Sequence, residues 1–175
     1  MIDFTKSKQY TLSIRLSTDG FSFSIYNPIH DDSLSIIEKE IDASLSLTAN
    51  LKAVFHESDF LNHPYKRVNI MMAGKRFTIV PLELFEEEQA ELLFYHNHQK
   101  KENETVLYNI LRKNNVAVIF GIDKSAQIFL NEQYPEARFY SQSTPFIDYF
   151  SVKSRLGNSK KMYASVRKDG IDIYC

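Results

Sequence analysis

The sequence predicts an α/β fold of the mixed α+β kind, in which helices pack against a sheet that has both parallel and antiparallel strands. Three observations predict it. Apolar and polar residues alternate over residues 11–26, an Asp19-Gly20 step interrupts that alternation, and strand-like runs then alternate with helix-like runs. Period-two alternation buries one face of a strand. An Asp-Gly step between two such runs marks a tight hairpin, and alternating strands and helices form a sheet covered by helices.

The first half of the chain continues from this hairpin. Pro28 ends the second strand because it has no N–H to donate. Residues 34–41 fit either a third strand or a short helix. Asp42 is placed to cap a helix over residues 43–56, where apolar residues recur at helical spacing. Strands are expected over residues 68–72 and 76–80, followed by a glutamate-rich helix that begins at Pro81.

The second half follows the same alternation. Two strands are expected over residues 105–111 and 116–122, joined by a turn whose asparagines tolerate left-handed backbone. A helix then starts at Asp123 or Ser125, and a short strand covers residues 137–141. Ser143 or Thr144 is expected to cap a last helix, with Pro145 in its first turn. Residues 157–161 have the composition of a linker.

Residues 163–175 repeat the pattern of the opening hairpin. When Asp169-Gly170 is laid on Asp19-Gly20, the apolar positions of the two segments coincide. The coinciding pairs are Leu16 with Val166, Phe21 with Ile171, and Phe23 with Ile173. A hairpin of this size is marginal on its own in water. We therefore expect its apolar face to be covered by the first half, by a second copy through dimerisation, or, preferably, by the remainder of a second half.

Composition limits the class of protein. The 175 residues suit one domain, or one domain plus a fragment, and the hydrophobic fraction of 43% excludes extensive disorder. The net charge of −1 supplies no field for nucleic acid. The polar N-terminus, the lack of any apolar run near the ~20 residues of a membrane span, and the single cysteine, Cys175, lead us to expect a cytoplasmic protein.

The order of elements, a meander, alternating helices and strands, and then the same hairpin, resembles the actin-like ATPase fold, a relative of the ribonuclease H fold. Two similar halves of that fold each open with a three-strand meander. The sequence is also similar to an uncharacterised bacterial family assigned that fold, in which a longer chain completes the second half. The resemblance implies a first half over residues 1–156, a linker over 157–161, and the opening of an incomplete second half over 162–175.

The resemblance also locates the positions where an active member would bind a nucleotide. There, the first turn of each half reads roughly Asp-x-Gly-(Ser/Thr)-(Ser/Thr), with the Asp serving a magnesium-bound water. Arg15 and Ser17 stand at the Asp and Gly positions of the first copy, and Ser165 and Arg167 at those of the second. A cation cannot replace a metal-facing carboxylate, and a Cβ keeps the backbone away from phosphate. Both phosphate-binding turns are therefore expected to be degenerate.

Weak cofactor-binding candidates remain at the two turns, where ordinary turn roles are favoured. They are Ser17, Thr18, Asp19, Gly20, Asp169 and Gly170. We expect no catalytic residue, no cofactor and no metal ligand. The first strand has no carboxylate for two-metal nuclease chemistry. His96 and His98, even with His56 or His63, lack the spacing of a metal site. Lysine pairs at 100–101 and 160–161 are too short to form a nucleic-acid patch.

Three hypotheses for function remain open. The first is a non-catalytic binding or assembly module on a degenerate actin-like scaffold, which would dock a protein partner rather than act as an enzyme. The second is a divergent ATPase or sugar-kinase-like phosphotransferase. The third is an unrelated α+β interaction domain, in which the two hairpins are coincidental.

Overall fold

The computed structural model describes residues 2–29, 34–155, 160–167 and 170–174. Its strands are β1 (Thr11–Ser17), β2 (Gly20–Tyr26), β3 (Leu34–Lys39), β4 (Arg67–Met72), β5 (Phe77–Pro81), β6 (Glu104–Leu111), β7 (Val116–Asp123), β8 (Arg138–Ser141), β9 (Tyr163–Arg167) and β10 (Gly170–Tyr174). Its α-helices are α1 (Leu47–Glu57), α2 (Ala90–Asn97), α3 (Lys124–Gln133) and α4 (Ser143–Ser154). Most of the expected linker, together with Asp169 and Cys175, lies outside the described residues.

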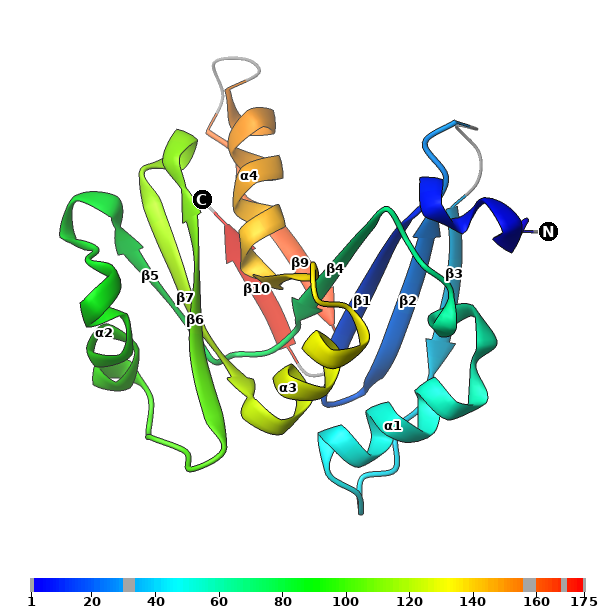
Figure 1. The fold of residues 1–175 in the computed structure, drawn as a ribbon. Coiled ribbons are helices and arrows are strands. Elements are labelled where there is room, and N and C mark those ends of the chain that lie inside the picture. Colours follow the sequence, from blue (N-terminus) through cyan, green and yellow to red (C-terminus); the bar gives the residue numbers. More distant parts are fainter. Residues whose placement is uncertain (1, 30–33, 156–159, 168–169, 175) are drawn as a thin grey trace.

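A five-stranded mixed sheet with the order β3-β2-β1-β4-β8 organises the molecule. β1, β2 and β3 form the expected antiparallel meander, so residues 34–41 adopt the strand alternative, while β1, β4 and β8 run parallel. α1 and α3 lie together over one face of this sheet (Figure 1). The core between them contains Leu12, Ile14 and Phe23, which are fully buried. The predicted alternation of the hairpin therefore fixes which face of the sheet the two helices cover.

A second, antiparallel sheet with the order β5-β7-β6 is inserted in the chain between β4 and α3. α2 packs against it through Phe94, which is fully buried beside Ile119. The turn predicted between β6 and β7 is present, and Asn115 in it adopts the left-handed conformation with φ 55°. The sequence predicted these strands individually but did not show that they form a separate sheet.

Two helix starts were predicted wrongly. α1 begins at Leu47, and its cap is Ser46, whose Oγ accepts from the N–H of Ala49 at 3.1 Å, while Asp42 accepts from Ser44. The helix expected at Pro81 begins only at Ala90. Short 3-10 turns precede it, and Phe85 between them is extended because its ring packs on a tyrosine of β6, 5.0 Å between centroids.

Two other helix starts were left open by the sequence. Asp123 caps α3 by accepting from the N–H of Ala126 at 2.8 Å, which settles the choice between Asp123 and Ser125. α4 begins at Ser143 with Pro145 in its first turn, so the expected cap at Ser143 or Thr144 is wrong: the residue before the helix is Gln142, and its side chain makes no capping hydrogen bond. Among the helices that the structure describes, none is long and apolar enough to span a bilayer.

β9 and β10 form the second hairpin, a two-stranded ribbon beside α4 (Figure 1). Its register repeats that of the first hairpin: Leu16 pairs with Phe21 in β1–β2, and Val166 pairs with Ile171 in β9–β10. The ribbon packs on α4 through tyrosines, and the ring of Tyr163 stacks on that of Phe150 at 4.4 Å. The local prediction of a repeated hairpin register is therefore confirmed for the described residues.

Candidate functional site

The first candidate turn, between β1 and β2, is closed by an ion pair. Nη1 of Arg15 lies 3.6 Å from Oδ1 of Asp19, and both side chains are about one-third exposed or less. Gly20 has φ 145°, and a Cβ placed on it would lie 2.9 Å from the carbonyl oxygen of Lys39. The glycine is therefore required by the close approach of the strand β3, a structural reason that involves no phosphate.

Ser17 and Thr18 line a small cavity of about 330 Å³ at the carboxyl end of β1. The other polar lining groups include Asp42, whose carboxylate accepts from the hydroxyl and N–H of Ser44. These bonds, the hydroxyl bond first, lower the pKa of Asp42 below its usual value. Asp19 and Gly20 do not line this cavity, so the four candidate residues of the first turn do not converge on one volume.

The second candidate turn lies near the same edge of the sheet. Asp169 is outside the described residues, but a Cβ on Gly170 would lie 3.7 Å from Nζ of Lys75 in the connection after β4. Nε2 of Gln142 lies 3.4 Å from Oδ2 of Asp172 and joins the ribbon to the start of α4. The carboxyl edge of parallel strands, where open α/β sheets bind their ligands, thus holds residues of both hairpins.

Sequence reasoning missed Lys75, Gln142 and Asp172 at this edge. Lys75 and Gln142 both follow a parallel strand, and this position was the one signal that could have singled them out. In the sequence, Asp172 looks like any polar residue on the solvent-exposed face of a hairpin, so nothing marked it as a site residue.

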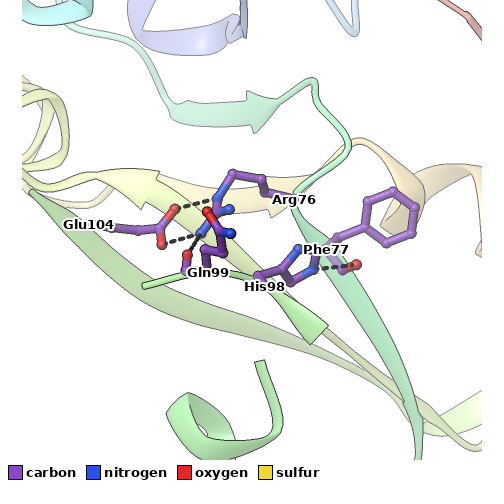
Figure 2. Close-up of polar contacts among 5 residues, drawn as sticks. All are labelled: Arg76, Phe77, His98, Gln99 and Glu104. Carbon is purple, nitrogen blue, oxygen red and sulfur yellow. Dashed lines mark hydrogen bonds and ion pairs between the residues drawn. The ribbon is translucent and has the colours of Figure 1, made fainter. Parts of the chain in front are cut away.

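Two of the candidate histidines, His63 and His98, make structural contacts. Nε2 of His98 lies 3.1 Å from the carbonyl oxygen of Phe77 (Figure 2). The ring of His98 also packs on that of Phe94, with 4.5 Å between centroids. His63 stacks on Phe4 at 4.9 Å. Within the part of the chain that the structure describes, no three His, Cys, Asp or Glu side chains gather in a metal-binding arrangement.

Figure 2 also shows a forked ion pair that joins the start of β5 to β6. Nε and Nη2 of Arg76 donate to the two carboxylate oxygens of Glu104 at 2.7 and 2.6 Å, and Nη2 also donates to the carbonyl of Gln99 at 2.9 Å. Glu104 is 5% exposed, and its hydrogen bonds raise the pKa of Arg76 above the usual value. Both carboxylate oxygens of Glu104 accept from Arg76, and Nε and Nη2 of Arg76 have partners within the chain, so we assign the fork to stabilising the inserted sheet.

The meander, the parallel strands β1, β4 and β8, and the repeated hairpin together define a protein of the actin-like ATPase fold. The comparisons agree. The whole chain, residues 1–175, matches the DUF3822 family, described as proteins of unknown function, and it belongs to that family.

A solved relative supports the assignment of the fold. It is a crystal structure of a protein from Bacteroides thetaiotaomicron VPI-5482, described as having an actin-like ATPase fold and unknown function. The two share 82% sequence identity with a TM-score of 0.94, and the match covers 100% of this chain and 68% of that chain. No curated protein matches the chain significantly. The alternative of an unrelated α+β domain is therefore wrong.

Proposed function

We propose that this protein is a non-catalytic binding or assembly module built on an actin-like scaffold. The observation that carries the proposal is the Arg15–Asp19 pair at the first turn. A phosphate-binding turn must offer free backbone N–H groups and a carboxylate for the metal. Here an arginine lies at the carboxylate position and is paired with the carboxylate four residues on, so the turn stabilises itself.

The domain organisation that goes with this proposal has residues 1–156 as a first half, 157–161 as a linker and 162–175 as the start of a second half. The two hairpins share a register but differ in burial. Leu16 and Phe21 are at most 1% exposed, whereas their counterparts Val166 and Ile171 are 74% and 62% exposed. An apolar face of this kind supports a cover made by further polypeptide of a second half, with dimerisation through the ribbon as the alternative.

One observation favours the second candidate, a divergent ATPase or sugar-kinase-like phosphotransferase. Lys75 lies against Gly170 at the edge where Ser17 and Thr18 line a cavity. A lysine near glycine and hydroxyl groups is a common phosphate-binding set. A cavity of about 330 Å³ is at the small end of ligand sites, which span about 300–1,000 Å³. We therefore rank the phosphotransferase second. For the binding module we propose that the partner is a cytoplasmic protein and not a nucleic acid.

Isothermal titration with magnesium-ATP tests the two functions against each other. The binding module predicts no heat of binding at micromolar protein, and no difference between the unaltered chain and an Asp19→Ala variant. The phosphotransferase predicts micromolar affinity that Lys75→Ala weakens by about ten-fold, because a charged hydrogen bond to phosphate is lost. Clear saturable binding of this kind would refute the proposed function.

A further inference from the structure

A large groove lies on the face of the five-stranded sheet opposite α1 and α3. Its volume is about 1020 Å³, at the upper limit of small-ligand pockets, which is about 1,000 Å³. The floor is made by the short side chains of Ser13, Ser22 and Ser24 on β1 and β2. One wall comes from β6 and the start of α4, and the other rim from Leu34 and Ile36 on β3.

Three arginines line this groove, from three of the parallel strands: Arg15 on β1, Arg67 on β4 and Arg138 on β8. The ion pairs found among the described residues involve neither Arg67 nor Arg138, and both side chains are exposed. Asp148 is the only acidic side chain that the described residues contribute to the lining. The chain as a whole has a net charge of −1, so the positive charge here is local.

The spacing of the arginines decides which kind of anion fits. In the register of the sheet, Arg138 pairs with Asn69, next but one to Arg67, so these two cations lie on adjacent strands. Arg15 pairs with Met71, four residues beyond Arg67 along β4, which corresponds to about 13 Å. One phosphate group could contact Arg67 and Arg138 together but could not also reach Arg15, whereas carboxylates repeated along a peptide can contact all three.

The apolar residues of the groove also favour a peptide ligand. Leu34 is 57% exposed and Ile36 is 61% exposed on one rim, and Phe146 and Leu111 line the other side. A ligand that follows the groove would thus bury apolar side chains at its two rims and place acidic groups against the arginines. This alternation of apolar anchors and carboxylates is the pattern of an amphipathic peptide segment.

We propose that this groove binds an acidic amphipathic segment of a partner protein, with Arg67 and Arg138 as its principal charge contacts. The proposal rests on the binding-module function above and specifies its partner. It requires electrostatic specificity, because charges such as those of Arg67 and Arg138 select the sign of the partner's charge more than they raise the affinity.

The test uses a fluorescent synthetic peptide of about 18 residues, five helical turns, with glutamates on one face and leucines on the other. A second peptide carries lysine in place of every glutamate. We expect the acidic peptide to bind the 175-residue chain at least about ten-fold tighter than the basic one by fluorescence anisotropy, with affinity falling as salt is raised.

Two double variants locate the contact. Arg67→Glu with Arg138→Glu should weaken the acidic peptide by at least about ten-fold and reverse the preference toward the basic one. Lys8→Glu with Lys101→Glu makes the same charge change at exposed positions outside the groove lining and should change the affinity less than about two-fold. Circular dichroism of each variant confirms that it is folded.

Four outcomes overturn the proposal: no binding at about 0.2 mM protein, equal affinity for the two peptides, an unchanged affinity in the groove variant, or tighter binding of a single-stranded oligonucleotide. The longer Bacteroides relative adds a fifth. If this chain binds the peptide and that protein does not, the groove is filled from within the longer chain. Binding of magnesium-ATP is measured separately at the turn edge, so failure of the proposed function is distinguishable from failure of the groove.

Discussion

Replacement of Asn109 by alanine should destabilise the contact between the two sheets. Asn109 lies on β6 and its side-chain amide reaches the β8–α4 connection. Nδ2 donates to the carbonyl of Phe139 at 2.9 Å, while Oδ1 accepts from the N–H of Ser141 at 3.0 Å and from the hydroxyl of Thr144 at 2.7 Å. One side chain thus satisfies groups at the end of β8 and in the first turn of α4, where Ser141 and Thr144 are buried.

The magnitude follows from what is left unpaired. Truncation leaves the Phe139 carbonyl and the Ser141 N–H without their partner, at about 1–2 kcal/mol each, so the free energy of unfolding should fall by about 2–4 kcal/mol. With a urea m-value of about 2 kcal/mol/M, the midpoint of unfolding should drop by about 1–2 M. Chemical denaturation followed by circular dichroism measures this.

Asn131→Ala provides the matched control, because Asn131 is exposed on α3. It should change the free energy of unfolding by no more than about 0.5 kcal/mol. If Asn109→Ala lowers the midpoint no more than the control does, the amide is not a structural link between the sheets and the reasoning is refuted.

Three further changes test separate parts of the structure. Gly121→Ala should lower stability by about 1–3 kcal/mol in a thermal melt, because the added methyl overlaps the carboxylate of Glu104; an unchanged melting temperature would contradict this. Ser46→Ala should cost about 1 kcal/mol and reduce helical circular dichroism, since it removes the cap of α1. Burial raises the pKa of Tyr65 to about 12, so its neutral form stabilises the fold fully below pH ~10, and that contribution is lost as the pH rises toward 12. Denaturation midpoints should therefore fall more steeply above pH ~10 for the unaltered chain than for Tyr65→Phe.

Local signals predicted most of the elements. The Asp-Gly steps marked both hairpins, and the period-two alternation identified the buried face of the first one. Asn115 was predicted to tolerate the left-handed backbone that it adopts. The start of α2 was wrong because the contact of Phe85 with the strand β6 overrides the helix signal of the preceding glutamates, and a contact between distant residues leaves no trace in local spacing.

The candidate site shows the same division. The resemblance to the actin-like ATPase fold aligned Arg15 and Ser17 with the positions where a phosphate-binding turn needs Asp and Gly, and this alignment stays a prediction. The pairing of Arg15 with Asp19, the approach of Lys75 to Gly170, and the groove arise from strand register and from the insertion of a second sheet. These depend on which strands become neighbours, which a single sequence does not specify.

The aromatic contacts of the ribbon determine which of its two sides is presented outward. Tyr163 and Tyr174 point toward Phe150 on α4, so the isoleucines and the valine of the same hairpin point the other way. Because side chains alternate strictly along a strand, turning the ribbon over would exchange all of them at once. The two tyrosines thus hold the hairpin in one orientation, and replacing both with aliphatic residues would remove the ring contacts with Phe150 that favour that orientation.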